Sequence, residues 1–412
     1  MAATTPSLAE IRAAVDEYIA GLSDRLFELN QKIHQRPELA YKEHYAHDTI
    51  CDFLETLGFT PTRHAYGLDT AFELISGAPD DDARTVNFNA EYDALPDIGH
   101  GCGHNLIATA SITAFLGLAH AIDKFGLNGR TQLLGTPAEE DGGGKIDLLN
   151  AGAYKHVDVS LMLHPETEDA FTKFGAIGSG GLGAVACYDI ICRYTGVSAH
   201  SSACPYEGIN ALDAVVAAYN NISMLRQQIR PEERIHGTIL HAPKITNAVP
   251  ELAVTKYTVR SATATGARAL GARVRKCLEA GALATGCSLA FDESPVMADL
   301  RINTPLCDSW KAHMAAQGER ILDPDPNDLS GSTDQGNVTH AVPGLHALLG
   351  IPVVDAANIH THGFAAAAAT PFAHDRTVMG GKALAMTGVD VLLDEEFYAR
   401  VVRDFEEDKK RR

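Results

Sequence analysis

The chain has 412 residues, of which 45% are hydrophobic and 21% charged, and a formal net charge of −19 at pH 7. This length predicts two domains or one domain carrying an insertion, and this composition excludes a largely disordered chain. Because 53 acidic residues outnumber 34 basic ones, we expect an acidic surface that repels polyphosphates and no nucleic-acid partner. No apolar stretch approaches the roughly 20 residues that span a bilayer and no leader-like segment opens the chain, so we expect no membrane partner and a cytoplasmic location.

Eight cysteines are spread along the chain without a C-x-x-C pair. This pattern argues against a zinc ribbon, a thioredoxin-type site and a small scaffold held by disulfides. Most of the cysteines are therefore expected to be reduced and buried.

The first part of the chain alternates between helical and strand patterns. A first helix is expected after a cap at Thr5 or Ser7. Short apolar segments of β type then begin at Thr85, Thr131 and Val157, the last of which we expect Pro165 to end. A helix over 106–121 and a second one over 145–154 separate them. This alternation predicts an α/β fold with a mostly parallel sheet and flanking helices.

The pattern changes near Phe171. A strand, a helix over 210–228, two strands, a helix over 265–286 and a further strand form a compact α+β module, and the earlier alternation resumes after Pro295 with a closing helix over 380–393. We therefore predict a metal-binding catalytic domain in two parts, 1–186 and 297–412, interrupted by an α+β lid domain over 187–296.

Residues that can bind metal follow each of the three predicted parallel strands. They are Cys102 and His104 in "GHGCGHN", Glu139 and Glu140 in "GTPAEED", and His164 in "LMLHP". The carboxyl ends of parallel strands meet at one edge of a sheet, so these side chains are expected to converge. Taken singly, each has a simpler explanation: a buried cysteine beside a core histidine, two solvated glutamates at a helix N-terminus, and a second core histidine.

The adjacent glutamates fit two different roles. Neighbouring residues in an extended segment point in opposite directions, so one carboxylate can bind metal while the other faces substrate as a general base. A thiolate and imidazoles suit zinc or another late transition metal.

Six segments together resemble the M20 metallopeptidase family: "EYDALPDIGHGCGHN", "GTPAEEDGGGKIDLLNAGAY", "LMLHP", "GVSAHSSACPYEGINALDAV", "GSTDQGNVTH" and "NIHTHGF". The likeness is strongest to the branch with a cysteine ligand, which includes a β-alanyl-lysine dipeptidase and the aminobenzoyl-glutamate hydrolases. The resemblance implies a zinc-binding α/β domain with an inserted lid domain.

The resemblance also implies a role for individual residues. Glu139 matches the general base, Asp93 the acid that orients a ligand, and His200 the lid histidine that stabilises the oxyanion. The residues matching substrate-binding positions are Asn247 and Arg260, which would hold a carboxylate, and Gln335, where an aromatic pocket wall is usual. Those matching metal ligands are Cys102, His104, Glu140, His164 and His360. His362 is the alternative to His360, and His100 is a candidate for supporting the ligand loop.

The implied activity is metal-dependent hydrolysis of an amide bond in a dipeptide of β-alanyl-lysine type, by a metal-activated water. N-acyl amino acid or aminobenzoyl-glutamate hydrolysis is the alternative, as is recruitment to biosynthetic chemistry, whereas a non-enzymatic metal carrier would not need Glu139. The implied cofactors are two divalent ions, zinc or else manganese or cobalt. The implied assembly is a homodimer joined through the lid, with His200 acting in its own or in its partner's site.

Overall fold

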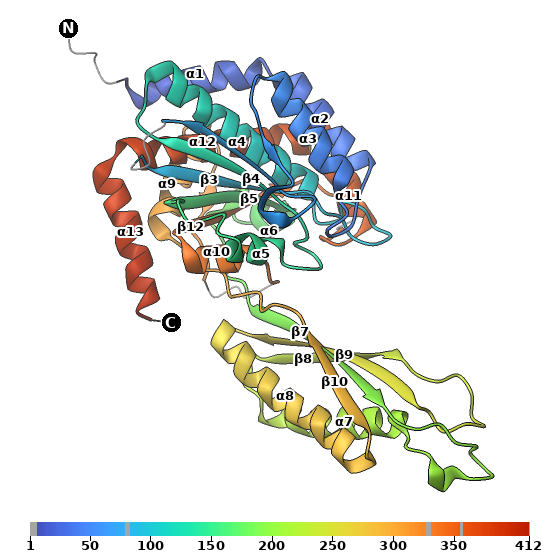
Figure 1. Cartoon of the computed structure of the whole chain (residues 1–412). Helices are drawn as coiled ribbons and strands as arrows, with labels where there is room; N and C mark the ends of the chain where they lie inside the picture. The colour runs from blue at the N-terminus through green and yellow to red at the C-terminus, as the bar shows by residue number, and fades with distance from the viewer. Residues whose placement is uncertain (1–5, 79–82, 327–330, 355–356, 412) are drawn as a thin grey trace. The chain divides into compact units, whose positions relative to one another are not determined.

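The computed structural model describes residues 6–78, 83–326, 331–354 and 357–411 (Figure 1). The chain divides into two compact units. The first contains the described residues up to Gly183 and those from Leu300 onward except 331–332, and the second contains Ala184–Asp299 together with residues 331–332.

An eight-stranded sheet forms the centre of the first unit, in the order β1-β2-β4-β3-β5-β12-β6-β11. The four strands β4, β3, β5 and β12 are mutually parallel, whereas β2 joins β4 and β6 joins β12 in antiparallel fashion. The mixed, mostly parallel α/β sheet expected from the sequence is thus confirmed. The strands are β1 (Thr62–Arg63), β2 (Phe72–Gly77), β3 (Thr85–Glu91), β4 (Arg130–Thr136), β5 (Val159–Thr167), β6 (Gly178–Ser179), β11 (Ile321–Leu322) and β12 (Gly344–Ile351).

Helices cover both faces of this sheet (Figure 1). α4 and α12 pack together on one face over the large apolar core, and α5 and α10 lie on the other face beside a smaller core around Leu134 and Val338. The helices of this unit are α1 (Leu8–Ala20), α2 (Ser23–Gln35), α3 (His44–Thr56), η1 (Ala65–Gly67), α4 (His104–Phe125), α5 (Gly144–Asn150), α6 (Asp169–Thr172), α9 (Thr304–Ala315), α10 (Gln335–Ala341), α11 (His362–Ala368), α12 (Pro371–Leu393) and α13 (Glu395–Lys409).

The second unit is a four-stranded antiparallel sheet in the order β10-β7-β9-β8, with α7 and α8 packed against it around a core of its own. Apolar residues from both helices and from β7 and β9 form this core, which is why the unit is compact by itself. Its elements are β7 (Ala186–Thr195), η2 (Pro205–Glu207), α7 (Ala211–Leu225), η3 (Arg226–Gln228), β8 (Arg234–His241), β9 (Leu252–Ser261), α8 (Ala264–Thr285) and β10 (Ser288–Glu293).

The structure shows where two predicted helices begin and where one predicted strand ends. Ser7 caps α1 in a capping box with Glu10, whereas Thr5 lies outside the described residues. Pro165 does not end β5, which continues to Thr167, because only the β12 side of the strand is paired there. The closing helix starts nine residues earlier than expected, at Pro371, because the hydroxyl of Thr370 accepts a hydrogen bond from an amide of the first turn.

Among the described residues, one helix is long and apolar enough to cross a membrane, namely α4. Of the 18-residue window that meets this test, 94% is buried inside the first unit. Such burial is typical of a core helix, and here α4 lies between α1, α12 and the sheet.

Candidate metal centre

The candidate site lies at the carboxyl edge of the parallel strands. β3 ends at Glu91 shortly before Asp93, Cys102 and His104, and β4 ends at Thr136 three residues before Glu139. His164 lies near the end of β5. The four strands run in the same direction, so their ends bring these distant segments to one edge of the sheet.

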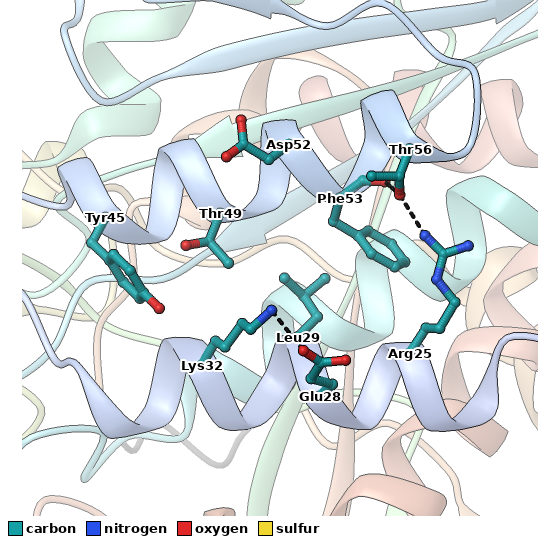
Figure 2. A pocket seen from close by; sticks show the side chains of 9 residues that line it. All are labelled: Arg25, Glu28, Leu29, Lys32, Tyr45, Thr49, Asp52, Phe53 and Thr56. Atoms are coloured by element: carbon teal, nitrogen blue, oxygen red, sulfur yellow. Dashed lines mark hydrogen bonds and ion pairs between the residues drawn. The ribbon is translucent and has the colours of Figure 1, made fainter.

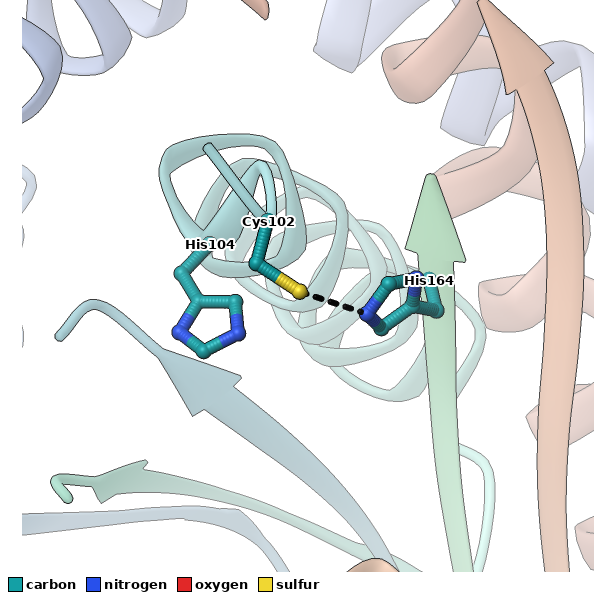
Figure 3. Close-up of side chains that lie close together, drawn as sticks. All are labelled: Cys102, His104 and His164. Carbon is teal, nitrogen blue, oxygen red and sulfur yellow. Dashed lines mark hydrogen bonds between the residues drawn. The ribbon is translucent and has the colours of Figure 1, made fainter. Parts of the chain in front are cut away.

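The loop after β3 turns sharply to present two ligand-type side chains. Gly103 has a φ of 79°, in the left-handed region that glycine adopts without strain, and α4 begins directly afterwards at His104. Figure 3 shows Cys102 between the rings of His104 and His164, with its Sγ 3.4 Å from Nε2 of His164. The loop thus places a thiol and two imidazoles together.

Asp93 fixes the orientation of His104. Its Oδ1 lies 2.8 Å from Nδ1 of the imidazole, and its Oδ2 accepts a hydrogen bond of 2.9 Å from the backbone amide of Glu140. Because the carboxylate accepts the proton on Nδ1, the lone pair of the neutral ring lies on Nε2. That Nε2 atom is buried and has no hydrogen-bond partner.

Both glutamates after β4 approach the same imidazole nitrogen. Oε1 of Glu140 lies 3.8 Å and Oε2 of Glu139 3.9 Å from Nε2 of His104. Ala138, which precedes them, has a φ of 58°, a conformation that costs free energy for a residue other than glycine. The backbone is thus held in an unfavourable conformation where it presents the two carboxylates.

His360 completes the cluster from the segment after β12. Its Nε2 lies 3.4 Å from Oε1 of Glu140, and its backbone amide donates a 2.7 Å hydrogen bond to Gly101 in the β3 loop. His362, the alternative considered from the sequence, is exposed and begins α11. His100 is buried, with Nε2 3.2 Å from the carbonyl of Ile33, and so supports the loop rather than facing the cluster.

The side chains form three groups whose ligand atoms all lie within 4.8 Å of one another. They are Cys102 with His104 and His164, Cys102 with Glu140 and His360, and His104 with Glu139 and Glu140. A thiol, three imidazoles and two carboxylates, with one buried imidazole nitrogen unpartnered, fit a divalent metal of the zinc type.

The peptidase family M20/M25/M40 matches residues 87–365 of this sequence, which is the stretch that holds every residue of the cluster. The chain belongs to this family. An M20 chain of this kind is a hydrolytic enzyme that uses metal ions.

Individual relatives cover this M20 chain to different extents. An Xaa-Arg dipeptidase of Mus musculus is 38% identical over 97% of this chain and 94% of the relative. One of the two p-aminobenzoyl-glutamate hydrolase subunits of Escherichia coli (strain K12) is 29% identical over 67% of this chain and 59% of the relative. Among solved structures, a dinuclear metal-binding M20 peptidase of Bacillus subtilis superposes with a TM-score of 0.64 at 19% identity, over 90% of this chain and 99% of that one.

The electrostatics of the M20 site are those of a crowded, buried cluster. Burial, reinforced by the charges of Glu91 and Glu140, raises the pKa of Glu139 well above its usual range. Burial also opposes ionisation of Glu140, but contacts with His360 and His104 outweigh it and lower the pKa of that carboxyl. A bound cation stabilises ionised carboxylates and thiolates, so metal binding at this site favours the ionised forms.

Three of the four remaining predicted residues lie in the second unit, where His200 and Asn247 are neighbours. The amides of Ser202 and Ala203 donate to Nδ1 of His200, at 3.3 and 3.2 Å, so the proton of the neutral ring lies on Nε2. The amide of Ser201 donates to the carbonyl of Asn247. The side chains of both His200 and Asn247 are exposed.

Arg260 lies at the opposite end of the same sheet. It pairs with Cys187 at the start of β7, whereas Leu252 pairs with Thr195, the last residue of β7, five residues before His200. Eight residues of extended strand span about 26 Å, so Arg260 and His200 of one chain lie far apart. Nη1 of Arg260 donates to the hydroxyl of Ser332 at 2.8 Å.

Gln335, the last of the predicted substrate-binding residues, lies in the first unit. Its side chain is 0% exposed, and its Oε1 accepts a 2.8 Å hydrogen bond from Asn89 of β3 inside the first unit. Gln335 begins α10, and its Nε2 is buried without a hydrogen-bond partner.

Sequence reasoning missed four buried charged residues beside the cluster: Glu43, Glu91, Lys145 and Asp334. Oε1 of Glu43 accepts hydrogen bonds from the amides of Ala138 and Tyr41, at 2.9 and 3.0 Å, and so holds the residue before Glu139. The sequence feature that could have revealed such buried charges is a charged residue inside or directly after an apolar segment, such as Glu91 at the end of β3.

A separate groove lies between α2 and α3 (Figure 2). Charged, polar and apolar side chains line this groove. Glu28 and Lys32 form an ion pair there, and Arg25 donates a hydrogen bond to Thr56. None of the predicted site residues lines it.

Proposed function

We propose that this protein is a metal-dependent dipeptidase that cleaves dipeptides with a cationic C-terminal residue. The observation that carries the proposal is the buried, unpartnered Nε2 of His104, which faces the carboxylates of Glu139 and Glu140 within a set of metal-ligand side chains. The substrate class is supported by the Xaa-Arg dipeptidases of mouse and human, each 38% identical over 97% of this chain. A β-alanyl-lysine substrate, expected from the sequence, belongs to the same class.

We propose that the cluster holds two divalent ions, most simply zinc. Cys102 belongs to two of the three ligand groups, so its thiolate would contribute to holding the ions. Together with His104, His164, Glu140 and His360 it provides five ligands, more than the four of a single tetrahedral ion. When bound, such ions activate water and polarise the scissile carbonyl.

The chain's own residues then divide the proton transfers. Glu139 accepts the proton of the attacking water and passes it to the leaving amine, while Asp93 holds His104 in the tautomer that binds metal. Nε2 of His200 carries the proton that hydrogen-bonds to the oxyanion, and Asn247 and Arg260 hold the substrate carboxylate.

Two features of the second unit support our proposal of a homodimer joined through that unit. β8 is an edge strand whose Ile239 and Leu240 are 47% and 53% exposed, and unpaired apolar edges are commonly covered by a partner. Arg260 and His200 stand at opposite ends of the sheet, so one compact site can use both only if they come from different chains. We therefore propose that His200 acts in the partner's site.

We also propose that residues 187–296 act as the lid.

We propose that the enzyme works in the cytoplasm. No disulfide links the cysteines of the described residues, as is usual where thiols are kept reduced. Cell fractionation with an antibody to the chain tests the location, and a secreted or membrane-bound pool would contradict it.

Hydrolysis of an N-acyl amino acid or an aminobenzoyl-glutamate is the second candidate. It is supported by the 29% identity to the Escherichia coli p-aminobenzoyl-glutamate hydrolase subunit, over two thirds of this chain.

One substrate panel separates the two candidates. Purified protein reconstituted with zinc, manganese or cobalt is assayed against Xaa-Arg and Xaa-Lys dipeptides, β-alanyl-lysine, N-acyl amino acids and aminobenzoyl-glutamate. The highest kcat/KM on a dipeptide with a cationic C-terminus supports the proposal, and a preference for aminobenzoyl-glutamate supports the alternative. No amide hydrolysis with any metal would refute both.

A further inference from the structure

A buried ion cluster lies directly against the metal-ligand residues of the first unit. Nζ of Lys145 is 2.6 Å from Oε1 of Glu91 and 2.5 Å from Oδ1 of Asp334. The exposed fraction is 0% for Lys145 and Asp334 and 1% for Glu91. Burying three charges costs several kcal/mol per ion before pairing, so a contribution to stability alone does not account for this ion cluster.

The two oxygens of Glu91 face different groups, whereas both oxygens of Asp334 face Lys145. Asp334 uses both oxygens on Lys145, because Oδ2 accepts a 2.8 Å hydrogen bond from its backbone amide. Glu91 uses Oε1 on Nζ of the same lysine. Its Oε2 instead lies 3.5 Å from Nε2 of His104.

These two facing atoms are both acceptors when the His104 ring is neutral, as metal binding through Nε2 requires. Asp93 holds the proton of His104 on Nδ1, so the lone pair of Nε2 points toward Oε2 of Glu91. Two lone pairs 3.5 Å apart repel unless a cation or a proton donor lies near them. Oxygens of Glu139 and Glu140 approach the same Nε2, at 3.9 and 3.8 Å, which makes a cation the better match.

We propose that Glu91 is a further metal-directed carboxylate: Lys145 and Asp334 hold it so that its Oε2 faces the ion bound by His104 and raises the affinity of that ion. The inference rests on the proposed function, since it requires metal at His104. Lys145 acts as a positioning residue, because it binds one oxygen of Glu91 and leaves the other directed at the cluster. The opposing explanation is an ion cluster that only joins α5 and α10 to β3.

Glu91→Gln is the most direct test. The glutamine retains the shape and an oxygen for Lys145, and Asp334 still neutralises the lysine, so no unpaired buried charge is created. The matched control is Asp158→Asn, which removes a carboxylate at the opposite end of β3, where Asp158 accepts a hydrogen bond from the amide of Thr85. Both variants and the wild type are stripped of metal and titrated with zinc against a chromophoric chelator, and their cobalt(II) absorption spectra are recorded.

We expect Glu91→Gln to lower the affinity for one of the bound ions about 10–100-fold and to shift the cobalt absorption spectrum. Asp158→Asn should match the wild type in both measurements. Unchanged zinc affinity and an unchanged cobalt spectrum in Glu91→Gln would overturn the inference. If Glu91→Gln does not fold, as judged by thermal unfolding of the metal-free protein, Glu91→Asp is measured under the same criterion, since it keeps the charge but shortens the reach. A wild type that binds no metal would refute the proposed function itself, which is a distinguishable result.

Discussion

Gly103 and Pro165 approach so closely that a Cβ on the glycine would lie 2.6 Å from Cγ of the proline ring. This contact joins the loop after β3, which carries Cys102 and His104, to the end of β5, which carries His164. The short distance between the cysteine sulfur and the His164 ring depends on that close approach.

Gly103→Ala should therefore impair metal binding more than folding. The added methyl group meets a rigid ring, and the φ of 79° is unfavourable for alanine, so the loop must shift. We expect a loss of bound metal by elemental analysis and a destabilisation of about 1–3 kcal/mol. Gly126→Ala is the matched control, since that glycine also has a positive φ but no atom lies within 4 Å of its added Cβ. Equal metal content in the two variants would contradict the expectation.

The two adjacent glutamates should respond differently to the same change. Glu139→Gln should keep its metal and lose about 10²–10⁴-fold in kcat, because an amide cannot accept the proton of water. Glu140→Gln should instead lower the metal content, because Glu140 belongs to two ligand groups, one of which includes His360. Metal analysis and steady-state kinetics on both variants test the assignment of one glutamate as general base and the other as metal ligand. The same metal content and the same kcat in both variants would show that these roles are wrongly assigned.

Glu43 should make the stability of the metal-free protein depend on pH. Burial, with a contribution from the charge of Asp93, raises the pKa of Glu43 to about 7 from its ordinary value of 4.5. Between about pH 4.5 and 7 the folded state then binds more protons at this group than the unfolded state, so Glu43 lowers the free energy of unfolding as pH rises through that range. The shift corresponds to about 3 kcal/mol at most.

Urea unfolding of wild type and Glu43→Gln between about pH 4.5 and 8 measures this contribution. The variant should gain stability relative to the wild type as pH increases, and a difference that stays constant with pH would contradict the expectation. Glu38→Gln controls for the loss of a carboxylate near the same helix, because Glu38 accepts hydrogen bonds from the amides of Tyr45 and Ala46 at the start of α3.

Complementation tests whether His200 acts in the partner's site. Inactive Glu139→Gln and inactive His200→Ala proteins are mixed under conditions that allow subunit exchange. Random exchange makes half of the dimers mixed, and each mixed dimer has one intact composite site, so about a quarter of wild-type activity should return. No recovery despite proven exchange would place His200 in its own chain's site, and a monomer by light scattering would refute the assembly.

The sequence by itself determined the parts of this site that depend on local pattern. Apolar segments followed by ligand-type residues predicted parallel strands that carry Cys102, His104, the two glutamates and His164 to one edge, because strand direction and strand ends are encoded within short stretches. The family was also recognisable from short motifs. Boundaries that depend on capping, such as the start of α12, were less well placed, since a single side-chain hydrogen bond sets them.

Only the tertiary structure decided which distant residues meet. Lys145 could have been a solvent-exposed residue of α5, and its burial between Glu91 and Asp334 emerges only when α5 and α10 pack on the same face of the sheet. The contact of Gln335 could not be predicted for the same reason, since its side-chain oxygen accepts a hydrogen bond from Asn89, which lies 246 residues earlier in the chain. The separation of Arg260 from His200 likewise follows from the register of β7 with β9. Contacts between distant segments depend on how whole elements pack, and local sequence pattern does not encode that packing.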